Sequence, residues 1–149
     1  MAAKPQYLTG NIAAINEFID EFDVFLLDCD GVLWSGDHVF EGIPETIKLL
    51  QSKGKRTVFV TNNSTKSREE YLKKLTKLNI PSTVEDIFGS AYSASIYISR
   101  ILKLPPGKSK VFVIGEVGIE KELDSENVPH LAGRIPSSEE TSPPPTLRA

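Results

Sequence analysis

The sequence predicts an α/β protein built around an open, mostly parallel sheet. Three short apolar runs, at residues 24–27, 57–60 and 111–114, are typical of strands that are covered on both faces. The stretches between them are long enough for helices and carry apolar residues at helical spacing. Strands that alternate with helices form parallel β-α units with right-handed crossovers. No internal repeat competes with this architecture.

Local signals set the helix boundaries. Pro44 suits the first turn of a helix, and Gly54 suits the position just past its end. The segment 67–70 (SREE) is a capping box that opens another helix. A second helix-start signal at 82–85 precedes a short turn, expected at 86–88. The expected helices cover residues 12–20, 43–53, 67–78 and 91–104, with one more beginning at 119–123.

Composition narrows the class of protein. The 149 residues suit one domain, and a net charge of −3 excludes the basic surface that nucleic-acid binders need. No apolar stretch reaches the about 18 residues that indicate a membrane span, and no apolar run follows the N-terminus as in a secretory signal. The single cysteine, Cys29, excludes an internal disulfide and fits a reducing compartment. We therefore expect a soluble, cytoplasmic protein.

The composition also divides the chain. We expect an N-terminal extension at 1–11, a folded core at 12–133 and a polar tail at 134–149. The segment 137–145 has no hydrophobic side chain, so it buries nothing that would offset the entropy lost on ordering. The tail is therefore expected to be disordered.

Polar side chains follow two of the predicted strands. Asp28 and Asp30 come at the end of the first, and Thr61, Asn62 and Asn63 come at the end of the second. Ligands of open parallel sheets bind beyond the carboxyl ends of the strands. We therefore expect Asp28 and Thr61 to lie close together, on one side of that edge.

The two aspartates indicate magnesium and phosphate chemistry. Asp28 and Asp30 are two residues apart, so they project to the same side, with Cys29 opposite. Carboxylates this close repel each other unless a cation neutralises them, and oxygen ligands with few protein contacts favour Mg²⁺. One carboxylate beside Mg²⁺ is able to attack phosphorus while the other protonates the leaving oxygen. Gly31 lets the backbone approach a phosphate, and Thr61 with the amides after it would hold phosphoryl oxygens.

Two motifs carry a resemblance to a known family. Residues 25–34 (FLLDCDGVLW) resemble the first motif of haloacid dehalogenase (HAD) superfamily phosphatases, and residues 58–67 (VFVTNNSTKS) resemble the second. Together with 114–116 (IGE), they are most similar to the 4-nitrophenylphosphatase and phosphoglycolate phosphatase branch, from about residue 12 to 133. The resemblance implies a Rossmann-like core, Mg²⁺ as cofactor and a small phosphorylated metabolite as substrate.

The same resemblance implies roles for the site residues. Asp28 would be the nucleophile that forms an aspartyl-phosphate, and also a Mg²⁺ ligand. Asp30 would be the general acid and base, and would bind Mg²⁺ through its main-chain carbonyl. Thr61 and Asn62 would bind the phosphoryl group, with Asn63 beside them.

The resemblance covers only part of the family's pattern. Family members insert a large α/β cap after the third strand and then supply a lysine motif and a Gly-Asp-x-x-x-x-Asp metal motif, none of which occurs here. The sequence therefore predicts a truncated core whose turnover is poor, or an inactive fragment that at most binds Mg²⁺ and phosphate. The 24–28 strand would then be a sheet edge open to another chain or a second copy.

Two further points stay open at the level of sequence. A metal-dependent glycosyltransferase also uses Asp-x-Asp, but no nucleotide-binding signature accompanies the motif here. Trp34 suits either the core or the entrance to the site. For Cys29, the flanking carboxylates raise the pKa of the thiol, which argues against a reactive thiol.

Overall fold

The computed structural model describes residues 5–102, 104, 105 and 107–133. Contacts divide the chain into two compact units, which the sequence patterns did not indicate. The N-terminal unit comprises Met1–Asn63 and Arg68–Ser90, and the C-terminal unit comprises Ser64–Ser67 and Ala91–Ala149. The predicted tail at 134–149 lies outside the described residues, and the predicted boundaries of the core stay predictions.

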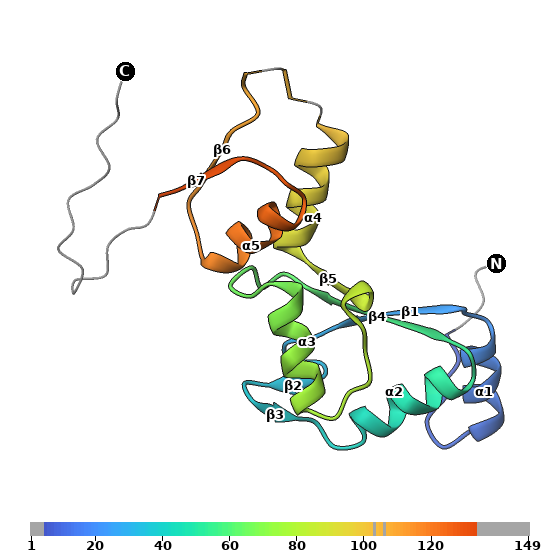
Figure 1. The fold of residues 1–149 in the computed structure, drawn as a ribbon. Coiled ribbons are helices and arrows are strands. Elements are labelled where there is room, and N and C mark those ends of the chain that lie inside the picture. Colours follow the sequence, from blue (N-terminus) through green and yellow to red (C-terminus); the bar gives the residue numbers. More distant parts are fainter. Residues whose placement is uncertain (1–4, 103, 106, 134–149) are drawn as a thin grey trace. The chain divides into compact units, whose positions relative to one another are not determined.

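The N-terminal unit holds a three-stranded parallel sheet (Figure 1). Its elements are α1 (Ile12–Asp20), β1 (Val24–Asp28), β2 (Trp34–Ser35), β3 (His38–Val39), α2 (Ile43–Ser52), β4 (Arg56–Thr61), α3 (Arg68–Lys77), the 3-10 helix η1 (Val84–Asp86) and β5 (Ile87–Gly89). The strand order is β1-β4-β5, so β4 is central. The two short strands β2 and β3 form an antiparallel hairpin. A parallel sheet whose strands alternate with helices along the chain confirms the predicted fold class.

Helix ends in this unit follow the local signals. The side chain of Asn11 accepts a hydrogen bond from the Ala14 N–H at 3.1 Å and so caps α1. Pro44 lies in the first turn of α2, as predicted. Gly54 follows the end of α2 with a φ of 74°, a conformation that glycine adopts without strain.

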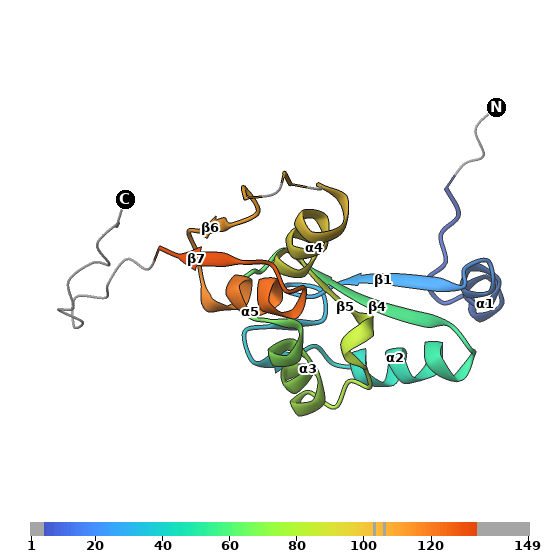
Figure 2. The same cartoon turned by 45° about the horizontal axis from the view of Figure 1, so that its top comes forward.

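The core of the N-terminal unit lies on one face of the sheet. Both α2 and α3 lie on that side in two views (Figures 1 and 2), and the β2–β3 hairpin contributes to the same cluster. The buried cluster consists of Cys29, Leu33, Trp34, Ile47, Phe59, Tyr71, Leu75, Ile80 and Ile87. These side chains come from the sheet, both helices and the hairpin, so the cluster holds the loop after β1 in place.

The opposite face of the sheet is largely exposed, although Val58 on it is buried. Leu26 is 71% exposed, and Val24, Val60 and Phe88 on the same face are also exposed. The expectation that the first strand is covered on both faces is therefore wrong, because α2 and α3 both pack on the other side. β1 pairs with β4 alone among the described residues, so its outer edge is unpaired there, as the sequence predicts.

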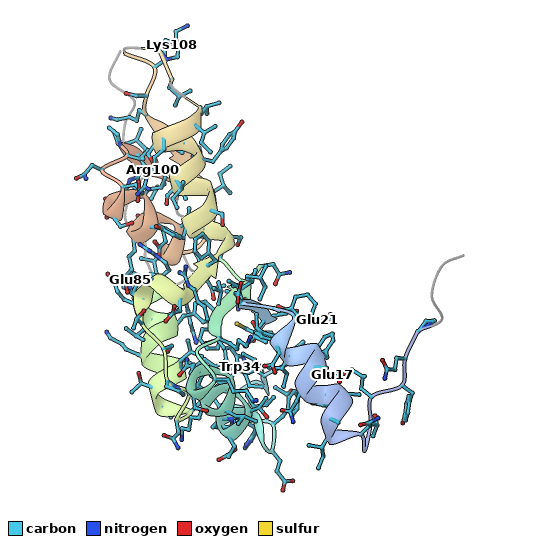
Figure 3. All side chains as sticks on the ribbon, turned by 90° about the vertical axis from the view of Figure 1, so that its right-hand side faces the viewer. Glu17, Glu21, Trp34, Glu85, Arg100 and Lys108 are labelled. Atoms are coloured by element: carbon cyan, nitrogen blue, oxygen red, sulfur yellow. The ribbon has the colours of Figure 1, made fainter. Side chains whose placement is uncertain are left out.

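The C-terminal unit is built on a separate two-stranded parallel sheet. Its elements are α4 (Ser90–Ile96, starting at the last residue of the other unit), the π-helix η2 (Tyr97–Ile101), β6 (Val111–Val113), α5 (Val117–Ser125) and β7 (His130–Ala132). Val113, Leu123 and Val128 form its small core. The guanidinium of Arg100, labelled in Figure 3, donates two hydrogen bonds to Glu126, at 2.7 and 2.9 Å, and ties η2 to the end of α5.

Two expectations about strands are wrong. The strand expected at 111–114 pairs with β7 and does not join β1 and β4. The third strand of the main sheet is β5, in residues expected to form a turn. Three residues are too few to show the alternation between buried and exposed side chains that marks a strand in a sequence. Only the pairing with β4 defines Ile87–Gly89 as a strand.

The helix expected at 91–104 also differs in detail. It is α-helical to Ile96 and continues as the wider π-helix η2, which sequence spacing does not distinguish. The last helix begins at Val117, two residues earlier than expected. None of the helices in the described part of the chain has the length and apolar character needed to cross a membrane.

Candidate active site

The predicted site residues lie at the carboxyl edge of the main sheet. Asp28 is the last residue of β1, and Thr61 is the last residue of β4. The parallel register places Asp28 directly beside Val60, one residue before Thr61. The register thus confirms that the two polar strand ends meet at one edge of adjacent strands.

The side chains of Asp28 and Thr61 leave that edge on opposite faces. Asp28 is exposed on the face of Val60, whereas Thr61 is 3% exposed and belongs to the core face. The expectation that both project to one side is wrong, because an offset of one residue in register reverses the face. A ligand would reach both residues only by lying beyond the strand ends, above the edge itself.

The aspartates of the first motif alternate as expected. Asp28 and Asp30 are exposed, and Cys29 between them is buried in the core, with 1% of its surface exposed. One oxygen of Asp28, Oδ1, accepts the Cys29 backbone N–H at 2.8 Å. The two carboxylates are thus presented to solvent at the end of β1, and the thiol is turned away from them.

Burial controls the chemistry of Cys29. Burial, together with the negative charges of Asp30 and Asp28, raises the pKa of the thiol from 9.0 to about 12, although the ammonium of Lys74 opposes the shift. The thiolate is the nucleophilic form of cysteine. Cys29 is therefore a core residue, in agreement with the argument from its neighbours in sequence.

A tight loop holds Asp30 against Trp34. Oδ1 of Asp30 accepts a hydrogen bond from Nε1 of Trp34 at 2.8 Å, and the two residues form a backbone bridge. The Gly31 N–H donates to the Trp34 carbonyl at 2.8 Å. Gly31 has a φ of 84°, and a Cβ built there would meet nothing within 4 Å. The backbone conformation, and not crowding, is therefore what requires glycine at this position.

The second motif forms a turn after β4 that side-chain hydrogen bonds hold in place. The Thr61 hydroxyl lies 3.3 Å from the Tyr71 hydroxyl and accepts the Asn63 N–H at 3.2 Å. The Asn62 carbonyl accepts a hydrogen bond from Oγ of Ser90 at 2.9 Å, and Asn62 itself is exposed. Thr61 thus supports the turn from the core side and leaves Asn62 at the surface of the edge.

Sequence reasoning missed two residues of α3 that support this region. The spacing of apolar residues in the helix expected at 67–78 indicates only a core position for Tyr71, but its hydroxyl contacts Thr61. Burial raises the pKa of the Tyr71 hydroxyl; the hydrogen bond with Thr61 lowers it, and the charge of Asp30 raises it further. Lys74, one turn later, lies with Nζ 4.4 Å from the ring centroid of Trp34 and donates to the Gly36 carbonyl at 2.9 Å. No local pattern marks either role, since both depend on how α3 packs.

The structure decides between the two positions that the sequence left open for Trp34. Trp34 is fully buried within the N-terminal unit, so it belongs to the core (Figure 3). Its indole N–H nevertheless reaches the exposed Asp30 carboxylate.

The donor set fits a hard divalent cation. Asp28 and Asp30 supply two exposed carboxylates and adjacent main-chain carbonyls. No cluster of three or more Asp, Glu, His or Cys side chains suited to a metal occurs among the described residues. Mg²⁺ does not need one, because it is bound through one or two carboxylates and keeps waters or substrate phosphate as its other ligands.

Fold and site together define an α/β protein with paired carboxylates at the carboxyl edge of a parallel sheet. Residues 25–129 match the model of the haloacid dehalogenase-like hydrolase family. The chain belongs to this family.

Similar proteins are phosphatases. The chain is 56% identical over 121 residues to a 4-nitrophenylphosphatase of Schizosaccharomyces pombe, covering 81% of this chain and 40% of that protein. It is 47% identical over 125 residues to the chloroplastic phosphoglycolate phosphatase 1A of Arabidopsis thaliana, covering 84% and 34%. A glycerol phosphate phosphatase of Mycobacterium tuberculosis, solved in complex with magnesium, superposes with a TM-score of 0.66 at 27% identity, covering 76% and 33%. The chain thus spans well under half the length of each of these relatives.

Proposed function

We propose that this protein hydrolyses small phosphate monoesters, of the 4-nitrophenyl phosphate and 2-phosphoglycolate type, in a Mg²⁺-dependent reaction through an aspartyl-phosphate. The observation that carries the proposal is the exposed Asp28–Asp30 pair at the end of β1, beside the turn that follows β4. Its relatives are named as phosphatases, which supports the same chemistry here.

In the first half of the reaction, a carboxylate oxygen of Asp28 forms a bond to phosphorus as the bond from phosphorus to the alcohol oxygen breaks. Asp30, in its protonated form, donates its proton to that leaving oxygen. In the second half, Asp30 takes a proton from water, whose oxygen bonds to phosphorus and displaces Asp28. Inorganic phosphate leaves, and both carboxyl groups return to their starting states.

Mg²⁺, when bound, would neutralise charge on the phosphoryl oxygens. Asp28 would hold the ion through its carboxylate and Asp30 through its main-chain carbonyl. The carboxylates at the edge are exposed, so a substrate phosphate has access to the same position.

The phosphoryl group would contact the turn after β4. Asn62 is exposed there and Asn63 is partly buried, so they would provide donors to the phosphoryl oxygens. Thr61 would act by holding that turn, since its hydroxyl accepts the Asn63 N–H. Gly31 would let the loop after β1 approach the phosphate without a side chain in between.

Release of 4-nitrophenol by the monomeric chain with Mg²⁺ tests the proposal. We expect slow turnover that Asp28→Asn abolishes, because a neutral amide does not attack phosphorus. Asp20→Asn at the end of α1 makes the same chemical change on another exposed aspartate and should leave the rate unchanged. Equal rates for wild type and Asp28→Asn would reject the mechanism.

A second candidate function is binding without turnover. It is favoured by the absence of a third carboxylate around Asp28 and Asp30 among the described residues and by the unpaired outer edge of β1. The protein would then bind Mg²⁺ and phosphate, or pair through β1 with another chain or a second copy. Calorimetry with Mg²⁺ and inorganic phosphate, run beside the turnover assay, separates the two functions. Binding that depends on Asp28 without nitrophenol release would support the second.

The proposed compartment is the cytoplasm. Cys29 is a free, buried thiol, which fits a reducing environment. Fractionation of cells that express the tagged chain tests this, and recovery in an organelle or membrane fraction would contradict it.

A further inference from the structure

The contact between Trp34 and Asp30 joins a buried donor to an exposed acceptor. Trp34 is 0% exposed and belongs to the buried cluster, so its ring is enclosed by other side chains. Its N–H lies 2.8 Å from Oδ1 of Asp30, whose side chain faces solvent. It is the only hydrogen-bond donor to this carboxylate among the described residues. One oxygen of Asp30 is therefore held by the core, and the other is left for a ligand.

The backbone prevents Trp34 from moving away from Asp30. The two residues form a bridge, and the Gly31 N–H donates to the Trp34 carbonyl at 2.8 Å. The Leu33 N–H donates to the Cys29 carbonyl at 2.9 Å within the same loop. The distance between the indole and the carboxylate is thus set by main-chain hydrogen bonds as well as by packing.

Lys74 holds the other side of the indole. Its ammonium lies 4.4 Å from the ring centroid and donates to the Gly36 carbonyl at 2.9 Å, so it is fixed from two directions. A cation over the face of an indole is attracted to the ring. It also draws electron density from the ring, which makes the N–H a stronger donor to a carboxylate.

We propose that Trp34 is a positioning residue for Asp30, with Lys74 as its support. The indole N–H fixes the Asp30 carboxyl in one orientation, so that its second oxygen faces the reacting group. This role rests on the proposed function in one respect, because it takes Asp30 to be the general acid and base of that reaction. A proton donor held in one rotamer needs no search among three staggered positions before transfer.

The single tryptophan of the sequence allows a test at one atom. Biosynthetic replacement of tryptophan by benzothienylalanine puts sulfur in place of the indole N–H and keeps the shape of the ring. Replacement by 5-fluorotryptophan keeps the N–H and is the matched control. In both proteins, the Hα–Hβ couplings of Asp30 measured by NMR report whether its side chain occupies one rotamer.

We expect one rotamer of Asp30 in the 5-fluorotryptophan protein and averaged couplings in the benzothienylalanine protein. We also expect kcat for 4-nitrophenyl phosphate to fall about threefold in the latter while KM stays within about twofold, since three staggered rotamers would then share the population. A general loss of structure would instead change the folded fraction. Unchanged couplings and unchanged kcat would overturn the proposal.

A second pair of variants keeps the test decisive if the sulfur analogue does not fold. Lys74→Met removes the cation over the ring, and Lys77→Met removes an exposed lysine one turn further along α3. The Trp34 indole N–H resonance should move upfield only in Lys74→Met, and an identical shift in both would overturn the role of Lys74. If wild type shows no Asp28-dependent turnover while the Asp30 couplings still depend on the indole N–H, the proposed function fails and the positioning contact stands.

Discussion

Cys29 allows a quantitative test of the packing beneath the site. Burial and the charges of Asp30 and Asp28 raise the pKa of its thiol from 9.0 to about 12. At pH 8, a thiol with the usual pKa is about one-tenth ionised, whereas one with a pKa near 12 is ionised in about one molecule in ten thousand. Only the thiolate reacts with iodoacetamide, so the native rate should be at least about a thousandfold lower than that of the unfolded chain.

The assay compares alkylation at pH 8 in buffer and in urea, with EDTA present so that no divalent cation alters the charges. A Cys29→Ala/Ser35→Cys variant, with a thiol at an exposed position of the hairpin, is the control for reagent and buffer. It should react at nearly the same rate folded and unfolded. A native Cys29 rate within about tenfold of the unfolded rate, in protein shown to be folded, would refute the burial and the charge argument together.

The same shift predicts a dependence of stability on pH. Between pH 9 and 12 the folded chain keeps the Cys29 proton and the unfolded chain loses it, so the free energy of unfolding falls as pH rises. The stabilisation is fully present below pH 9 and decreases by about 1.4 kcal/mol per pH unit through this window. Urea unfolding of wild type and Cys29→Ala at several pH values isolates this contribution, because all other titrating groups are common to both. Parallel pH profiles would contradict it.

Three further predictions concern backbone strain, close packing and the free sheet edge. Gly31→Ala should destabilise the chain by about 1–2 kcal/mol in urea unfolding through its positive φ alone, since a Cβ there meets nothing within 4 Å; no change would show that the loop relaxes. Gly118→Ala should cost more, because its Cβ would lie 2.7 Å from the backbone of Thr65 and Lys66, and an equal or smaller cost would refute that close approach. Leu26→Lys on the exposed face of β1 should reduce self-association in sedimentation velocity, whereas Leu49→Lys, also an exposed leucine but on α2, should not. Equal effects of the two lysines would reject β1 as the site of association.

Local patterns predicted most of the N-terminal unit. The structure agrees with the predicted helix at 12–20, with Pro44 in the first turn of α2 and with the strand that runs into Asp28. Each of these depends on neighbours a few residues apart. The pairing of strands is a long-range property and was predicted less well. Phe112 is 64% exposed in a strand interpreted as buried, because its partner is β7 and not the main sheet. Ile87, at 1% exposure, shows the converse, since contact with β4 makes a strand from a segment with turn signals.

The candidate site also has a part that local spacing predicts and a part that depends on strand pairing. Asp28, Cys29, Asp30 and Gly31 belong to one loop, so their alternation between solvent and core could be predicted from spacing alone. The direction of Thr61 could not, because it depends on the register between β1 and β4, which pairs Asp28 with Val60 and so places Thr61 on the opposite face.

The helix α3 connects the two halves of the site in a way that no local pattern shows. Tyr71 and Lys74 are three residues apart, so they lie on the same side of the helix. Tyr71 contacts Thr61 behind the second motif, and Lys74 contacts the ring of Trp34 behind the first. Leu75, which is fully buried beside them, fixes the helix against the core. Since both halves depend on one helix, a change that loosens α3 should disturb the orientation of Asp30 and the turn after β4 together, even though those residues belong to different loops.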